Sequence, residues 1–217
     1  MKLVLASNNA KKLAELRQLF AGLALELLPQ GEIGISEAAE PHITFVENAL
    51  AKARHAAMAS GLPAIADDSG LCVDALGGAP GVISAHYAPH VAPHDEPLPA
   101  VAGDREARRD VQDRANNQLL LHTLQGITDR RAAFVSTLVA VRSAQDPEPL
   151  IAFGRWPGVI LDAPRGSGGF GYDPLLYIEA HGKAAAELDA ATKNAISHRA
   201  LAAAQMIQLL RQAWHLA

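Results

Sequence analysis

The sequence predicts an α/β fold, because strand-like and helix-like segments alternate along all 217 residues. An apolar segment at 2–6 opens the chain and is followed by leucines at helical spacing. Two longer apolar segments, 132–141 and 150–156, flank the turn at 146–149, and an amphipathic segment from 201 closes the chain. This length and an apolar content of 49% are enough for one substantial core.

The composition limits the class of protein and the kinds of partner. Charged residues make up 19% of the chain and the formal net charge is −4, which argues against disorder and against a nucleic-acid-binding surface. The single cysteine, Cys72, excludes an internal disulfide framework and fits a reducing cytoplasm. The apolar opening is too short for a signal-peptide core, and no later apolar run reaches membrane-spanning length. We therefore expect a cytoplasmic protein with no membrane and no nucleic-acid partner.

The start of the chain predicts a strand at Lys2–Ala6, a polar junction and then a helix. Free N–H groups at a helix start, short polar side chains and lysines can together surround an anion, so the junction is a candidate phosphate site. Its members are Ser7, Asn8, Asn9, Ala10, Lys11 and Lys12. The sequence leaves open the alternative that Asn9 only caps the helix and that both lysines are solvated.

A second strand and a second helix follow this junction. Leu25–Leu28 is the strand candidate, and Thr44 and Glu47 form a Thr-x-x-Glu capping box at the head of an alanine-rich segment. We expect that helix to end near Gly61.

An acidic pair, Asp67 and Asp68, stands between two apolar segments, Ala64–Ala66 and Leu71–Val73. We predict two short strands with the pair at a strand end or in a tight turn. One such carboxylate can bind Mg²⁺ while its neighbour orients or deprotonates water, which is a common route to phosphoryl chemistry. The alternative is an ordinary surface turn, since Asp-Asp-Ser-Gly is also a common turn sequence.

A proline-rich segment at 88–103 interrupts the alternation and predicts a loop, with helix signals returning over 104–123. Three histidines recur there every four residues, as metal ligands on a helix would. They are His86, His90 and His94. Because prolines stand between them, the helix that this spacing needs cannot form, and we predict a loop without a metal site.

A glycine-rich segment, Gly166–Gly171, matches the letters of G-x-G-x-x-G. Pro174 follows and no helix begins there, so neither a dinucleotide fingerprint nor a kinase loop is indicated. On an extended segment, Phe170 and Tyr172 would project to the same side and stack on a planar base, with Asp173 at the edge of the base. The alternative is that both aromatics anchor the core.

Three donors lie around the start of the last helix and could reach a phosphate or the carbonyl edge of a base. They are Lys193, His198 and Arg199. Taken by themselves, they are expected to be solvated side chains.

Five motifs, in this order, resemble those of the inosine/xanthosine triphosphate (dITP/XTP) pyrophosphatase family and span nearly the whole chain. They are Ser7-x-Asn9-x-x-Lys12, Thr44–Ala49, Ala66–Leu71, Gly169–Pro174 and Ser197–Arg199. Two features depart from the family pattern. The segment 88–103 looks like a loop insertion, and Val46 stands where the family often has an acidic residue.

The resemblance implies one domain over 1–217, with an elongated mixed sheet, flanking helices and two lobes around a central cleft, usually in a homodimer. It implies conversion of the purine triphosphates ITP, dITP and XTP to a monophosphate and pyrophosphate. By motif position, the junction at 7–12 and Lys52 would hold the triphosphate, and Ser69 would touch the substrate. Glu40 and Asp68 would bind Mg²⁺, and Asp68 would also accept the proton of the attacking water.

The same resemblance assigns a nucleoside pocket to Phe170, Gly171, Tyr172, Asp173, Lys193, His198 and Arg199. Two other functions stay open. One is a Maf-like nucleotide pyrophosphatase with another base preference, and the other is a nucleotide-binding module without catalytic activity.

Overall fold

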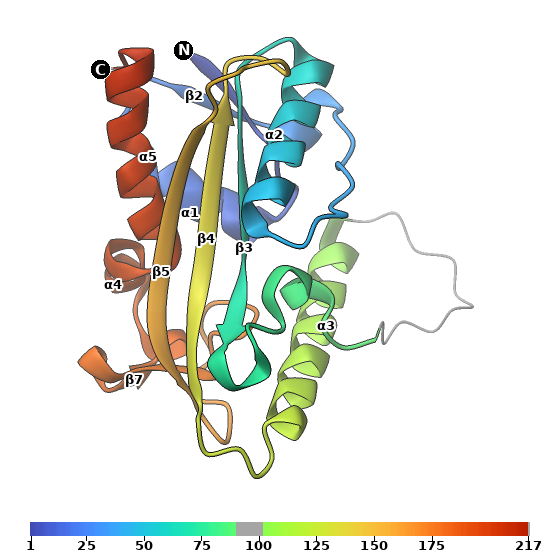
Figure 1. Ribbon diagram of the computed structural model, residues 1–217, viewed down its shortest axis with the longest axis vertical. Coiled ribbons are helices and arrows are strands. Elements are labelled where there is room, and N and C mark those ends of the chain that lie inside the picture. Colours follow the sequence, from blue (N-terminus) through green and yellow to red (C-terminus); the bar gives the residue numbers. More distant parts are fainter. Residues whose placement is uncertain (90–101, 217) are drawn as a thin grey trace. The chain divides into compact units, whose positions relative to one another are not determined.

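The computed structural model describes residues 1–89 and 102–216, and it gives the backbone alone for 102–106. Within these residues, seven strands form one mixed sheet in the order β2-β1-β3-β4-β5-β6-β7 (Figure 1). β1 runs parallel to β2 and β3, whereas β6 is antiparallel to β5 and β7. The strands are β1 (Lys2–Leu5), β2 (Glu26–Pro29), β3 (Ala64–Val73), β4 (Arg131–Val141), β5 (Leu150–Ile160), β6 (Leu176–Ile178) and β7 (Lys183–Ala184). The predicted α/β class is confirmed.

Five α-helices accompany the sheet in the described part of the chain, and none of them is long and apolar enough to cross a membrane. They are α1 (Ala10–Leu19), α2 (Phe45–Ser60), α3 (Ala102–Thr123), α4 (Ala190–Ile196) and α5 (His198–Trp214). The predicted start and end of α2 are confirmed, since Thr44 Oγ accepts from the Glu47 N–H and Gly61 takes the left-handed conformation at φ 69°.

Five short 3₁₀ helices connect these elements. They are η1 (Gln30–Ile33), η2 (Asp74–Leu76), η3 (Gly81–His86), η4 (Glu179–His181) and η5 (Ala185–Glu187). Most of the predicted loop at 88–103, with His90 and His94, lies outside the described residues. The predicted loop extends too far at its carboxyl end, because α3 already begins at Ala102.

The chain divides into two compact units, and three of the four boundaries fall inside β3, β4 and β5, while the fourth lies at the start of α4. Unit 1 comprises Met1–Ser69, Phe134–Trp156 and Ala190–Ala217, and unit 2 comprises Gly70–Ala133 and Pro157–Asp189. Each of these three strands therefore contributes residues to both units.

Two apolar layers build unit 1, one on each face of its strands. Because side chains alternate along a strand, Leu3 and Leu5 of β1 and Ile65 of β3 share one layer with residues of α1 and α5. The opposite layer contains Val4, Ala6, Ala49, Ala53, Ala56, Ala57, Ala64, Ala66, Val139 and Val141, so α2 covers that face with alanines. The alternation continues past residue 66 and assigns Asp67 to the first face and Asp68 to the second.

The prediction of two short strands around an acidic turn is wrong, because Ala64–Val73 forms one continuous strand. Asp67 and Asp68 are 2% and 5% exposed, so they lie inside the strand and inside the protein. Charged groups are tolerated there only with partners, and the Ser69 hydroxyl, two residues along on the same face, donates to Asp67 at 2.9 Å. The partners come from distant segments, which a local turn pattern does not include.

Candidate active site

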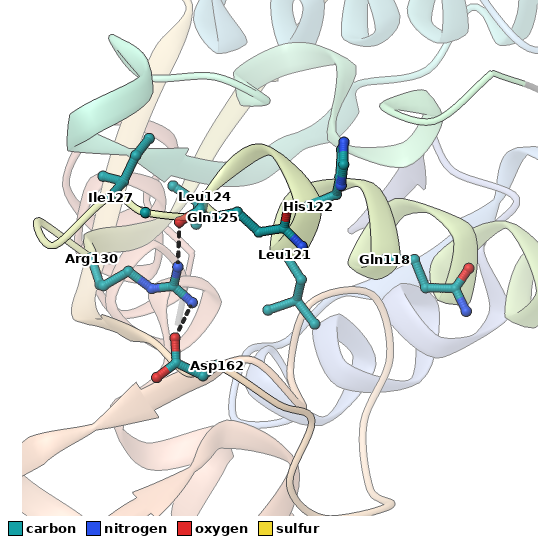
Figure 2. Close-up of a pocket in the computed structure, with 9 residues that line it drawn as sticks. Gln118, Leu121, His122, Leu124, Gln125, Ile127, Arg130 and Asp162 are labelled. Carbon is teal, nitrogen blue, oxygen red and sulfur yellow. Dashed lines mark hydrogen bonds and ion pairs between the residues drawn. The ribbon is translucent and has the colours of Figure 1, made fainter.

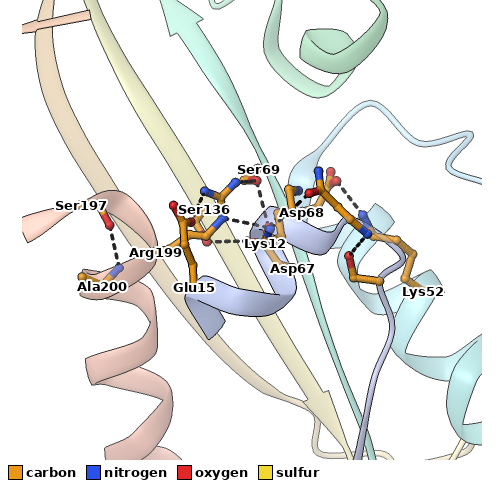
Figure 3. A network of polar contacts seen from close by, with 12 residues as sticks. Lys12, Glu15, Lys52, Asp67, Asp68, Ser69, Ser136, Ser197, Arg199 and Ala200 are labelled. Carbon is orange, nitrogen blue, oxygen red and sulfur yellow. Dashed lines mark hydrogen bonds and ion pairs between the residues drawn. The ribbon is translucent and has the colours of Figure 1, made fainter. Parts of the chain in front are cut away.

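Asp67 lies at the centre of a buried polar network in unit 1 (Figure 3). Its carboxylate contacts Lys12 Nζ at 2.9 Å and Arg199 Nε at 3.4 Å, and it accepts from Ser136 Oγ at 2.6 Å. Burial by itself raises the pKa of Asp67, but Lys12, Arg199 and the Ser136 hydroxyl outweigh it and hold the pKa well below its usual range. Asp67 is therefore an ionised counter-charge for two cations from different helices.

Lys12 projects from the first turn of α1, and its side chain is only 18% exposed. Burial lowers its pKa, although Asp67 acts in the opposite direction, and the neighbouring charges of Arg199 and Lys52 lower it further. The alternative in which Lys12 is solvated is wrong.

Arg199 and Lys193 are held by a second carboxylate, Glu15 of α1. Arg199 Nη1 contacts Glu15 at 2.9 Å, and Lys193 Nζ contacts it at 3.3 Å. Arg199 Nη2 also donates to Ser69 Oγ at 2.9 Å. The side chains of Arg199 and Lys193 are 5% and 8% exposed, so the alternative in which they are solvated is wrong.

Glu15 is absent from the predicted site. It lies three residues after Lys12, on the same face of a helix, and this spacing is the only local signal of its role. Its cationic partners stand more than 170 positions away in the chain, so local spacing could not reveal them.

Asp68 faces a different set of groups. Its Oδ1 accepts from Lys52 Nζ at 2.8 Å, and the same ammonium donates to Glu40 Oε2 at 2.7 Å. Its other oxygen, Oδ2, is buried and makes no hydrogen bond to the described residues. Burial raises the pKa of Asp68 to about 6, against the opposing influence of Lys52 and with a small contribution from Glu40. One carboxylate oxygen thus remains available for a ligand, and the structure brings the three predicted residues Glu40, Lys52 and Asp68 together.

In the junction before α1, the side chains of residues 7–9 make hydrogen bonds that set the local backbone conformation. Asn9 caps α1 by accepting the Lys12 N–H at 3.2 Å, as the capping alternative predicts, and the Asn9 N–H donates to Ser7 Oγ at 3.2 Å. Asn8 Nδ2 donates to Glu37 at 3.0 Å. Ala10 and Lys11 form the first turn of the helix with Lys12. The backbone N–H groups of this turn are the groups that an anion would meet.

His198 begins α5 within an aromatic stack in unit 1. Its ring lies 4.9 Å from that of Phe134 and 6.3 Å from that of Trp156, at interplanar angles of 25° and 16°. Burial, followed by the charge of Arg199, lowers the pKa of His198 well below its ordinary value, so the imidazole is neutral. A Cβ at Gly154 would collide with the His198 carbonyl, so the glycine allows β5 to approach α5 closely. His198 Nδ1 is buried and has no hydrogen-bond partner in the described part of the chain.

The loop Phe170–Asp173 belongs to unit 2 and is not an extended segment, which corrects the predicted geometry. Residues 171–175 form turns, and Gly169 and Gly171 have φ of 73° and 62°. The Phe170 N–H donates to Asp173 Oδ2 at 2.8 Å, which folds the loop back on itself. Tyr172 is 4% exposed and its hydroxyl donates to the Ser84 carbonyl at 2.8 Å, as a core anchor would.

A cavity of about 460 Å³ in unit 2 lies elsewhere, at the end of α3 (Figure 2). One of its lining residues, Arg130, donates to the Leu124 carbonyl at 2.9 Å and contacts Asp162, which also lines the cavity, at 2.9 Å. These bonds fix the chain around the end of α3, and none of the predicted site residues lines this cavity.

Comparison with known proteins agrees with the motifs. The family model described as the Ham1 family matches residues 3–209. The chain belongs to the Ham1 family. The predicted resemblance is therefore confirmed over nearly its full length.

Named relatives of this Ham1-family chain include the dITP/XTP pyrophosphatases of Methylibium petroleiphilum and Leptothrix cholodnii. Both are 66% identical to it, the first over 99% of each chain and the second over 100% of each. Among solved structures, a Ham1 protein from Coxiella burnetii has a TM-score of 0.84 and 42% identity, over 98% of this chain and 100% of its own. The Staphylococcus aureus Ham1 protein has a TM-score of 0.78 and 34% identity, over 97% and 98%.

Proposed function

We propose that this Ham1-family protein is a nucleoside triphosphate pyrophosphatase that converts ITP, dITP and XTP to the monophosphate and pyrophosphate. The observation that carries the proposal is the buried set around Asp67 and Asp68, in which Lys12 and Lys52 lie beside carboxylates at 2.9 and 2.8 Å. The names of relatives that are 66% identical over at least 99% of their length support the substrate class. In this role the protein removes non-standard purines from cytoplasmic nucleotide pools.

Lys12 and Lys52 hold the triphosphate in this proposal, together with the backbone of residues 7–12 and with Ser69. A lysine about 4 Å from a phosphate charge contributes on the order of 4 kcal/mol of gross attraction at an effective dielectric near 20, before desolvation. Both lysines are already desolvated and fixed by Asp67 and Asp68, which reduces the ordering needed when substrate binds.

Glu40 and Asp68 fit a site for Mg²⁺. Asp68 Oδ2 is a buried acceptor without a hydrogen bond from the described residues. Glu40 contacts Lys52, the same lysine that contacts Asp68, and its side chain is 46% exposed. Carboxylate oxygens suit Mg²⁺, which usually takes one or two protein carboxylates and completes its shell with substrate phosphates and water. When bound, the ion would neutralise charge on the phosphate oxygens.

Asp68 is the proposed proton acceptor. A water oxygen attacks the α-phosphorus, its proton passes to Asp68, the bond from that phosphorus to the bridging oxygen breaks, and pyrophosphate leaves. Lys12 and Lys52 stabilise the negative charge that develops on the phosphates. Asp67 has both oxygens engaged by Lys12, Arg199, Ser69 and Ser136, so it orders the cations and does not accept the proton.

The nucleoside pocket is assigned to Phe170, Gly171, Tyr172, Asp173, Lys193, His198 and Arg199. Donors from this set match the 6-oxo group of hypoxanthine and xanthine and leave the adenine amine mispaired. The Tyr172 hydroxyl donates to the Ser84 carbonyl, and Arg199 donates to Asp67, Glu15 and Ser69. Since their polar groups are already engaged, both side chains serve recognition by holding adjacent residues of their own segments in place.

One assay tests the function: pyrophosphate and orthophosphate are measured separately from ITP, XTP, dITP, GTP, ATP and dTTP, with and without Mg²⁺. We expect pyrophosphate from the first three and dependence on Mg²⁺. Orthophosphate alone would indicate removal of the terminal phosphate, and equal hydrolysis of ATP and ITP would contradict the proposed selectivity. Preference for a pyrimidine would indicate the Maf-like function, and binding without product would indicate a binding module. The proposed homodimer is checked by light scattering.

A further inference from the structure

One face of α3 in unit 2 carries three polar side chains at i, i+3 and i+4: Asp113, Asn116 and Asn117. None of them belongs to the predicted site, and amides in the middle of a helix usually point to solvent. Here Asn116 is only 1% exposed, and all three bond to the backbone of other segments. These three side chains therefore do more than present a polar helix surface to solvent.

Two of these residues hold the backbone of Gly171. Asp113 Oδ2 accepts the Gly171 N–H at 2.7 Å, and Asn117 Nδ2 donates to the Gly171 carbonyl at 3.0 Å. A single residue thus has its donor and its acceptor fixed by one turn of one helix. Gly171 has φ 62°, a left-handed conformation that few other residues adopt, so the loop depends on such bonds to keep its shape.

The third residue, Asn116, holds a second segment, 84–88, which the loop also contacts. It donates to the Ser84 and Ala85 carbonyls, each at 3.2 Å, and accepts the Ala88 N–H at 2.8 Å. The Tyr172 hydroxyl donates to the same Ser84 carbonyl. Residues 171 and 172 are therefore both fixed through α3, one directly and one through Ser84.

We propose that Asp113 and Asn117 are positioning residues that set the conformation of the loop Phe170–Asp173 and thereby its affinity for the nucleoside. The inference rests on the proposed function, in which this loop receives the purine. It assigns no bond-breaking role to either residue, since both contact the loop backbone.

The chemistry of the two positions is opposite. Position 113 must accept a hydrogen bond from an N–H, whereas position 117 must donate one to a carbonyl. Asn117 Oδ1 is buried without a hydrogen-bond partner among the described residues, so the amide acts here through its donor. An amide at 113 can still accept, but a carboxylate at 117 cannot donate and would repel the carbonyl.

The test is calorimetric titration with IMP and, separately, with inorganic pyrophosphate, both in Mg²⁺. IMP carries the nucleoside, pyrophosphate lacks it, and neither is a substrate of the proposed reaction. The variants are Asp113→Ala, Asp113→Asn, Asn117→Ala and Asn117→Asp. Gln118→Ala, at the exposed neighbouring position on α3, is the matched control.

We expect Asp113→Ala and Asn117→Asp to weaken IMP binding about tenfold, as loss of one hydrogen bond does, and to leave pyrophosphate binding unchanged. Asp113→Asn and Gln118→Ala should stay within about twofold of the parent protein. Asn117→Ala, which removes the amide without adding charge, should weaken IMP binding if Asn117→Asp fails to fold.

Unchanged IMP affinity in folded Asp113→Ala and Asn117→Ala would overturn the inference, and so would an equal loss for IMP and pyrophosphate. The parent protein's failure to bind IMP would overturn it as well. If the parent protein binds IMP yet releases no pyrophosphate from ITP, the proposed function fails, while the affinities still decide the positioning role.

Discussion

Asp67 and Asp68 are adjacent in sequence and both are buried, but they differ in their partners and in the direction of their pKa shifts. Asp67 meets Lys12, Arg199 and Ser136 on one face of β3, and its pKa is held well below the usual range. Asp68 contacts Lys52 on the other face, has one oxygen without a partner among the described residues, and has its pKa raised to about 6. The alternation of a strand separates two identical side chains into two environments.

The number of hydrogen-bond and ionic partners, more than the residue type, decides the role of each of these buried carboxylates. A saturated carboxylate has no oxygen left for a proton or a metal, so Asp67 contributes order and stability. A buried carboxylate with one oxygen that lacks a hydrogen bond can still bind a ligand or a proton there, so Asp68 suits a catalytic role. Five variants test these assignments.

Asp68→Asn should have the largest effect on turnover. The amide keeps an acceptor for Lys52 but loses basicity and charge, so kcat for ITP should fall by about 10²–10⁴-fold, the usual value for a general base. The unfolding midpoint in urea should decrease less than in Asp67→Asn, because Lys52 keeps Glu40 as a counter-charge. Near-normal turnover in the folded variant would contradict both the proton-acceptor and the metal assignment.

Asp67→Asn should mainly affect stability. It leaves Lys12 buried without its counter-charge and Arg199 with Glu15 as its remaining carboxylate, and breaking a buried pair in this way costs about 3–5 kcal/mol. Urea unfolding at neutral pH measures this cost, with Asp68→Asn as the matched control. The saturated–undersaturated distinction would be wrong if both variants lost the same stability.

His198→Phe tests whether buried, neutral His198 makes the stability of the protein depend on pH. Since the folded pKa of His198 lies well below its unfolded value of about 6.5, the unfolded chain binds more protons below that pH, and stability is lost as pH falls. At pH 5.5 the loss from this group is about 1.4 kcal/mol relative to pH 8. Phe keeps the stack on Phe134 and Trp156 without titrating, so the pH dependence of the urea midpoint should be smaller by that amount. An identical pH dependence in both proteins would show that His198 is not buried as neutral imidazole.

Thr44→Ala should have the smallest effect. It removes the N-cap of α2, the helix that carries Lys52, at a cost of about 1 kcal/mol, and should leave kcat/KM for ITP unchanged. Asn9→Ala removes the equivalent cap of α1 within the proposed phosphate junction, so it should cost similar stability and raise KM as well. Equal kinetics in the two variants would argue against a substrate role for the junction.

Local patterns predicted most of the fold correctly. Strand and helix periodicity predicts β1, β2, β4, β5, α1, α2 and α5, whereas β6, β7 and α4 are not predicted. The caps at Asn9, Thr44 and Gly61 are confirmed because capping depends on residues within one turn. The acidic pair was misplaced in a turn for the same reason. Turn chemistry is local, whereas the partners that bury Asp67 come from α1, β4 and α5.

The α/β class, the family motifs and the acidic pair follow from the sequence alone, because periodicity, capping and motif order are properties of neighbouring residues. The packed structure was needed to show that both Asp67 oxygens are bonded whereas one Asp68 oxygen is not, that Glu15 contacts two cations, and that α3 holds Gly171. Each of these features depends on groups that are far apart in the chain and meet only when the strands and helices pack. The burial and the hydrogen bonds that give these residues their roles therefore arise only in the folded protein.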